Sequence, residues 1–256
     1  MGKTKKNRSA WRARSATGAL AAAFFLQAPS AQADPADKVY LPTVVRGEWE
    51  LELRGGWQKW RNHDDDRERQ FVLDVGYALT SWWKSELAAG VTRLPGTSTR
   101  LDEIEWENIF ALTEPGQYWL DVGLFAELAR DYAEGRNVVA IGPMFQKEFG
   151  ALQTNVNLLF ERQLGAHAEA GAEIDYAWQV KWRGNPRFEP GVQGFGTLGR
   201  SNDFTHETEH RIGPAFFSQV VLGARHKIKF DAAVLFGLNR NTPNTTIRFN
   251  LEYEIL

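Results

Sequence analysis

The sequence contains no cysteine and, beyond residue 26, no apolar run of the length that a membrane-spanning helix requires. The lack of cysteine excludes disulfide bonds and metal sites built from thiolates. A spanning helix needs about 20 predominantly apolar residues. If the remainder of the chain crosses a membrane, it therefore has to cross with strands, whose backbone groups are satisfied by neighbouring strands.

Acidic side chains are missing from the first 33 residues, which hold six of the 30 basic residues and none of the 32 acidic ones. The basic start runs into the apolar stretch 16–26, after which Ala31 and Ala33 fit an A-x-A cleavage site. This pattern predicts a cleavable signal peptide over residues 1–33 and a mature chain that begins near Asp34. A basic amphipathic helix or a membrane anchor is the alternative, but the apolar stretch is too short to span a membrane.

Positive charge is scarce in the rest of the chain, where 24 basic residues face 32 acidic residues. The net charge of −8 argues against nucleic acid as a partner, because binding a phosphate backbone requires a positive field. It also provides no attraction to anionic lipid headgroups unless divalent cations bridge the two.

Strict alternation of apolar and polar residues is the strongest pattern that the sequence does contain. Over residues 247–255 the apolar side chains of Ile247, Phe249, Leu251, Tyr253 and Ile255 alternate with Arg248, Asn250, Glu252 and Glu254. Successive side chains of a strand leave opposite faces of the backbone. This strand therefore needs apolar surroundings on one face and water or other charges on the other.

The same period of two recurs along residues 34–256 and predicts about twelve strands. They are expected over residues 48–54, 71–79, 85–91, 103–112, 118–128, 138–147, 152–161, 173–182, 188–198, 211–218, 227–236 and 247–255. Pro190, Pro214 and several glycines interrupt the ninth and tenth, and without these two the count falls to ten. The connections at 61–70, 95–102, 130–137, 164–171, 199–210 and 239–245 are mostly longer and more charged than the others, as outer loops of a barrel are.

In its terminal strand and its chain-wide rhythm, the sequence resembles bacterial outer-membrane β-barrel proteins as a class. The resemblance implies an all-β fold, a single antiparallel transmembrane β-barrel of about 12 strands formed by residues 34–256. It also implies a Gram-negative outer membrane as the location, contact with outer-membrane lipid, and recognition of the C-terminal strand by the assembly machinery. A mean hydropathy of −0.41 agrees with this fold, because half of each strand faces a polar lumen. A soluble secreted β-protein is the rival, since alternation does not say which face meets water.

The polar face of the strands carries the candidate functional residues. Its acids and bases are Glu48, Glu50, Glu52, Arg54, Glu103, Glu105, Glu107, Lys181, Lys227, Lys229 and Arg248. Buried unpaired charges are very costly, so these side chains must be hydrated or paired. Paired across the lumen, they would fill a narrow barrel and be structural. Separated into an acidic and a basic wall around water, they would set the selectivity for ions or solutes.

No catalytic arrangement is readable in the sequence. None of the five histidines is followed two places on by serine, the His-x-Ser arrangement of barrel lipid hydrolases such as outer-membrane phospholipase. Three acids follow His63, but the separated acid and histidine pairs of omptin-type proteases are not reproduced. We therefore expect no enzyme activity and no cofactor. His206 and His210, four residues apart and beside acids, are weak candidates for a divalent metal site in an outer loop.

Three functions remain open from the sequence. A small porin-like channel would pass ions or small polar solutes along the charged lumen. A closed structural or adhesive barrel would act through the loops at 61–70 and 199–210. A barrel enzyme acting on lipid or peptide is the third, and its activity would depend on a histidine such as His206 or His210.

Overall fold

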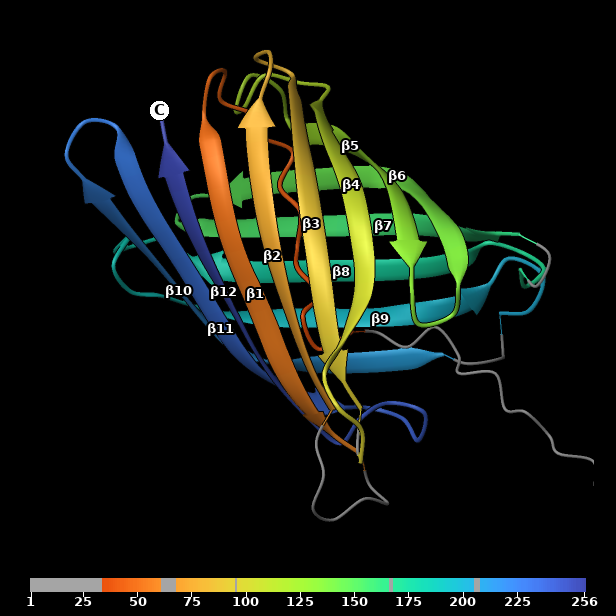
Figure 1. Ribbon diagram of the computed structural model, residues 1–256. Coiled ribbons are helices and arrows are strands. Elements are labelled where there is room, and N and C mark those ends of the chain that lie inside the picture. Colours follow the sequence, from red (N-terminus) through yellow and green to blue (C-terminus); the bar gives the residue numbers. More distant parts are fainter. Residues whose placement is uncertain (1–33, 61–67, 95, 166–167, 205–207) are drawn as a thin grey trace, which may run out of the picture. The chain divides into compact units, whose positions relative to one another are not determined.

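The structure is a computed structural model that describes residues 34–60, 68–94, 96–165, 168–204 and 208–256. Within these ranges the chain forms twelve antiparallel strands, each paired with its neighbours in the sequence. The first strand also pairs with the last, so the sheet closes into a barrel (Figure 1). No helix in the described part of the chain is long and apolar enough to cross a membrane. The predicted signal peptide, residues 1–33, lies outside the described residues.

The strands agree in number and order with the alternation in the sequence. They are β1 (Trp49–Lys59), β2 (Glu68–Ala78), β3 (Trp83–Arg93), β4 (Arg100–Ala111), β5 (Asp121–Asp131), β6 (Arg136–Phe149), β7 (Leu152–Leu164), β8 (Glu173–Trp182), β9 (Glu189–Arg200), β10 (Glu209–Leu222), β11 (His226–Gly237) and β12 (Thr245–Ile255). The expectation of an all-β barrel with twelve strands is confirmed, and the alternative count of ten is wrong.

The connections define two ends of the barrel. We call one the turn end, which holds the connections at 79–82, 112–120, 150–151, 183–188 and 223–225. The other is the loop end, where the connections predicted to be outer loops fall. β1 runs from the turn end to the loop end, and β12 returns to the turn end.

The outward face of the barrel is apolar. Leu53 of β1 and Leu73 of β2 are register partners at mid-height, and the side chain of Leu73 is 52% exposed. At the turn end, Trp82, Trp83 and Phe110 stack with ring centroids 6.2–6.4 Å apart. An exposed apolar band with aromatic rings at its border is the surface that a barrel presents to lipid.

Both strands that proline had left uncertain are present. Pro190 and Pro214 take their places in the β9–β10 ladder, opposite Phe216 and Val192. On the other side of β10, the paired positions pass from Ile212 to Ala215, so the ladder with β11 skips the proline, which has no N–H to donate. In a closed sheet the remaining bonds on both sides hold such a strand in place.

The fifth strand begins later than predicted. The sequence places its start at Tyr118, whereas β5 starts at Asp121 and Tyr118 lies in the preceding connection. The reason is a turn around Gly116, which has a positive φ of 72° and donates its N–H to the Asp121 carboxylate at 2.7 Å. Tyr118 and Leu120 in this connection extend the series of apolar residues at every second position of the fifth strand in the sequence, although they precede β5 in the structure.

Candidate functional site

The predicted lumen residues all lie on the inward face of the barrel. Glu50, Glu52 and Arg54 come from β1, Glu103, Glu105 and Glu107 from β4, Lys181 from β8, Lys227 and Lys229 from β11, and Arg248 from β12, while Glu48 directly precedes β1. Their burial differs along the barrel: Glu107 is 0% and Arg248 1% exposed, whereas the side chain of Lys229 is 31% exposed. The structure therefore places the most accessible charges near the turn end.

A segment to which the sequence analysis gives no role crosses the lumen. Residues 34–46, which we call the lumen segment, start at the loop end, where the Asp34 carbonyl accepts a hydrogen bond from Arg211 of β10. The chain leaves the lumen at the turn end, where the Gly47 N–H donates to Ala78 at the end of β2. In Figure 1 this stretch is the orange coil seen between the strands. Its path follows from contacts with strands on several sides of the barrel.

The barrel wall is shaped to receive the lumen segment at Gly56 of β1. A Cβ at this position would stand 2.1 Å from the carbonyl oxygen of Pro35, so only glycine lets the two backbones approach this closely. Gly55 and Gly56 interrupt the alternation of apolar and polar residues in the sequence. For this reason the first strand was predicted to end at residue 54, whereas β1 continues to Lys59.

Adjacent residues of the lumen segment contact opposite charges. The Asp37 carboxylate accepts a hydrogen bond from the Arg211 guanidinium at 2.6 Å. The Lys38 ammonium points to the β1–β4 side, where it lies 3.0 Å from Glu52 and 3.4 Å from Glu107. One acid and one base next to each other in the sequence thus tie the segment to two parts of the wall.

Apolar side chains hold the next part of the lumen segment. The Tyr40 ring lies 4.1 Å from Phe125, in a cluster of buried side chains from β4, β5 and β6. Val39 packs against a second cluster, built from β8 to β11, that includes Phe195 and Phe217. The lumen is therefore polar at its β1–β4 wall but partly apolar elsewhere.

The backbone of the lumen segment is satisfied by a side chain of the wall. The amide of Asn157 on β7 accepts a hydrogen bond from the Tyr40 N–H at 2.7 Å and donates one to the Tyr40 carbonyl at 2.9 Å. Asn157 is itself 0% exposed. This pair replaces the hydrogen bonds that an extended segment would otherwise make with water.

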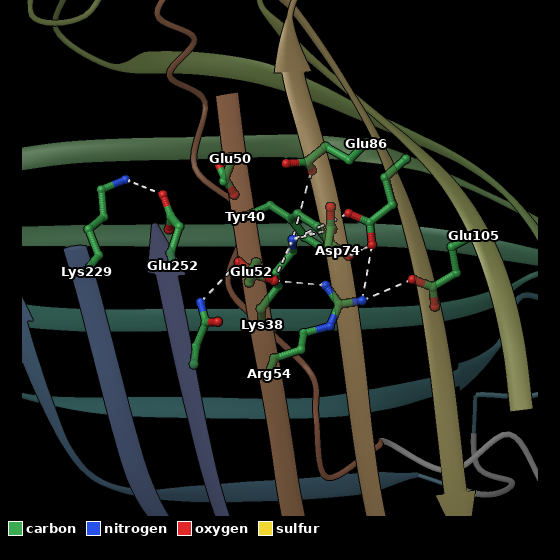
Figure 2. A network of polar contacts seen from close by, with 12 residues as sticks. Lys38, Tyr40, Glu50, Glu52, Arg54, Asp74, Glu86, Glu105, Lys229 and Glu252 are labelled. Atoms are coloured by element: carbon green, nitrogen blue, oxygen red, sulfur yellow. Dashed lines mark hydrogen bonds and ion pairs between the residues drawn. The ribbon is translucent and has the colours of Figure 1, made fainter. Parts of the chain in front are cut away.

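A network of ion pairs fills the middle of the lumen (Figure 2). The Arg54 guanidinium lies 3.3 Å from Glu52, 3.0 Å from Glu105 and 3.2 Å from Glu107. Lys38 meets two of the same carboxylates from the other direction. These charges are paired along the β1–β4 side of the lumen, with Arg54 and Lys38 as the bases.

The turn-end half of the lumen has further pairs and an empty space. Lys84 lies 2.7 Å from Glu50, Lys229 lies 2.7 Å from Glu252, and Lys181 lies 3.4 Å from Glu189. Lys227 pairs with Glu254. A cavity of about 170 Å³ is bordered by these side chains and by Lys38, Glu48 and Glu52. Space for water or a small solute therefore extends from the charged mouth to the central network.

Toward the loop end, the described residues make further polar and cation–π contacts. Arg248 donates to Gln193 at 2.7 Å and pairs with Asp231. The guanidinium carbons of Arg211 and Arg248 lie 5.5 and 5.4 Å from the centroid of the Phe195 ring. Glu103 accepts a hydrogen bond from Gln70 at 3.4 Å.

Of the two weak metal candidates, His210 is the one that lies within the described residues. His206 lies outside the described residues, as does the acid run after His63. The His210 ring nitrogen Nδ1 lies 2.9 Å from the Tyr176 hydroxyl and the two rings stack. Acid groups with the spacing of metal ligands occur in the lumen instead, among them Asp74, Glu86 and Glu107.

Sequence reasoning missed the partners of the predicted charges. Lys38 and Asp37 lie before the first strand, where no periodicity assigns a side chain to a face. A signal was present, however: the polar faces of the first four strands carry more acids than bases, and a buried surplus requires a cation from elsewhere. Apolar residues at inward positions, such as Phe125 and Phe195, were a second signal that something apolar packs inside.

No protein-family model matches the sequence, and neither does any curated protein. Solved structures do match. The NanC porin is 13% identical over 80% of this chain and 99% of its own, with a TM-score of 0.54. An outer-membrane channel from Pseudomonas putida F1 is 12% identical over 88% and 99%, with a TM-score of 0.54. The translocator domain of the autotransporter NalP from Neisseria meningitidis is 8% identical over 83% and 88%, with a TM-score of 0.50. At such low identities the likeness shows the fold, which is that of bacterial outer-membrane β-barrels.

Proposed function

We propose that the protein is an outer-membrane channel for ions or small polar solutes, and that the lumen segment limits its conductance. The observation that carries this proposal is the charged cavity of about 170 Å³, which reaches from the turn end to Lys38. Charged side chains that line a water-accessible space are the means by which pores select ions or polar solutes, which supports this reading of the cavity. The NanC porin and the Pseudomonas putida channel share the fold, which supports the proposal.

The outer membrane is the proposed location, with residues 1–33 as a cleavable signal peptide. The apolar outer band supports insertion into lipid. Fractionation of expressing cells tests the location: the protein should require detergent for extraction from the outer membrane, and N-terminal sequencing should begin near Asp34. Recovery as a free periplasmic protein would contradict it.

The role of the lumen segment can be tested with an engineered disulfide, because the chain has no cysteine of its own. Ala36 packs in a buried cluster with Val72 of β2 and Ala88 of β3. In a variant with Ala36→Cys and Val72→Cys, oxidation should lock the segment to the wall and reduction should release it. Thiol labelling after unfolding reports whether the bond has formed.

Single-channel conductance in a planar bilayer is the readout. We expect the reduced form to conduct and the oxidised form to conduct less, with each cysteine alone insensitive to oxidation. A channel that conducts equally in both states would remove the segment from the proposal. A folded barrel that is silent in both states would contradict the channel function itself.

The predicted lumen acids can be tested in the same assay. Replacement of Glu103, Glu105 and Glu107 by glutamine removes three negative charges from the β4 wall, so cation preference should fall. The reversal potential in a salt gradient measures this. Unchanged selectivity would exclude these acids from the conduction path.

A closed barrel that acts through its outer loops is the second candidate. The observation that favours it is the number of contacts that pin the lumen segment, from Arg211 on β10 to Asn157 on β7. A silent but correctly folded wild-type barrel would support it. We propose no enzymatic function.

A further inference from the structure

A cage of carboxylates surrounds the Lys38 ammonium and joins the predicted Glu52 and Glu107 to Asp74 and Glu86, which the sequence did not single out (Figure 2). Its nitrogen lies 3.0 Å from Glu52, 3.4 Å from Glu107, 3.5 Å from Asp74 and 3.9 Å from Glu86. These acids come from β1, β4, β2 and β3, and none has a side chain more than 3% exposed. Four neighbouring strands each contribute one carboxylate to a single cation.

The strands alone do not neutralise this cage. Arg54 pairs with Glu52 and Glu107, and Lys84 pairs with Glu86. Asp74 has no basic partner among the described residues other than Lys38, and within the same part of the chain its Oδ1 atom makes no hydrogen bond. Asp74 is 1% exposed. The barrel wall thus presents a buried carboxylate with unused acceptor capacity, and among the described residues Lys38 is the cation that meets it.

The geometry fits an ammonium group. The distances of 3.0–3.9 Å from the Lys38 nitrogen are those of charge-assisted hydrogen bonds and ion pairs. Asp74, Glu86 and Glu107 also have the spacing of metal ligands, so a divalent cation is the competing occupant that the experiment has to separate. Three donors of one –NH3⁺ group can share four carboxylates. The site is also within reach of solution, because the turn-end cavity is lined by Lys38, Glu52 and Lys84.

We propose that this cage is a binding site for small solutes with a primary ammonium group, and that Lys38 occupies it as a tethered competitor. The site would take an alkylammonium in place of the lysine side chain when the lumen segment moves. This inference deepens the proposed function, on which it rests for transport, by naming primary amines as the solute class. Binding itself does not require conduction.

Chemical rescue tests the site. Lys38→Ala removes the ammonium and leaves space for it, whereas Lys38→Met removes the charge but fills the space. The probe is n-propylammonium chloride, which replaces the missing part of the side chain. The urea midpoint of unfolding, followed by tryptophan fluorescence of the refolded barrel, is the readout.

We expect the midpoint of Lys38→Ala to fall below that of wild type and propylammonium to restore at least half of the loss, with saturation. Lys38→Met should not respond to the amine, and wild type should respond only at higher amine concentration than Lys38→Ala, because its own Lys38 competes for the site. Tetramethylammonium chloride at equal ionic strength should not replace propylammonium, because it has no N–H donor. Adding Asp74→Asn to Lys38→Ala should weaken the rescue at least tenfold in amine concentration. If Lys38→Ala refolds only with the amine, the refolding yield gives the same comparison.

Three results would overturn the inference. An equal effect of both ammonium salts would reduce it to ionic strength, and rescue by MgCl2 alone would assign the cage to a metal. No rescue of a folded or refolding-deficient Lys38→Ala would remove the site. The proposed function is tested separately. Amine rescue in a barrel that does not conduct would support the binding site and contradict the channel function. Conduction without amine rescue would support the channel function and contradict the binding site.

Discussion

The buried guanidinium of Arg54 allows a quantitative test of whether the centre of the lumen is dry. Its side chain is 6% exposed and faces Glu52, Glu105 and Glu107 at 3.0–3.3 Å. Replacement by methionine keeps most of the volume and leaves three carboxylates without this partner. Removing one member of a buried pair typically costs about 3–5 kcal/mol, whereas an exposed pair contributes about 0.2–1 kcal/mol. The two regimes are far enough apart to be distinguished.

We therefore expect Arg54→Met to lower the free energy of unfolding by about 3–5 kcal/mol. The assay is reversible urea unfolding of the barrel in lipid vesicles, followed by tryptophan fluorescence. Arg183→Met is the control, because this arginine lies 2.7 Å from Glu148 and its side chain is 44% exposed. It also lies 3.6 Å from Glu189 and donates to Gln153 at 2.9 Å, so its loss should have a measurable cost, but a smaller one than that of Arg54. Combining Arg54→Met with Glu105→Gln should recover part of the loss, since one unpaired charge is removed.

A loss below about 1 kcal/mol for Arg54→Met would refute this reasoning. It would mean that water solvates the three carboxylates, and that the centre of the lumen is hydrated in spite of its close ion pairs. The same result would strengthen the case for conduction through the middle of the barrel.

Three further predictions concern the outer face and the lumen segment. Leu73→Arg, at mid-height on the outer face, should destabilise the barrel in a bilayer by about 2–4 kcal/mol, whereas Leu238→Arg in the β11–β12 connection should cost little. Equally small effects of both variants on unfolding in vesicles would contradict the assignment of Leu73 to the membrane-facing surface. Phe125→Ala should cost about 3–5 kcal/mol, because the ring is 0% exposed and supports Tyr40, and Phe204→Ala, 60% exposed in a connection, is its control in the same urea titration. Asn157→Leu leaves both backbone groups of Tyr40 without their partner and should cost about 1–3 kcal/mol per group; trypsin cleavage after Lys38 should also accelerate, and protection equal to wild type would argue against the contact.

The strands of this barrel are readable from sequence because their two faces have opposite chemistry. Leu51 and Leu53 face outward and Glu52 faces inward whatever the exact ends of β1 are, since a strand alternates strictly. The ends themselves are less visible. Glycines at 55 and 56 hide the second half of β1, and the apolar turn at Tyr118 extends the apparent fifth strand.

The contents of the lumen were only half predictable. The alternation of side chains along each strand assigns Glu107 and Arg54 to the inward face. It does not predict that the two side chains lie 3.2 Å apart, because this distance depends on the stagger of β1 against β4. The lumen segment has no period, since it pairs with no strand and its side chains point to several walls in turn. Asp37 and Lys38 therefore look like residues of a linker, although each meets a buried partner.

The pairing of the first strand with the last has a consequence for the order of assembly. The ring can close only when β12 is in place, and β1 directly follows the lumen segment. If the segment takes its place while the sheet is still an open, curling ribbon, it does not have to pass the side chains that hold it. The barrel then closes around the segment that leads into its first strand, as a soluble protein folds around its hydrophobic interior. Variants that loosen Lys38 or Tyr40 should slow the closing of the seam as well as weaken the finished barrel.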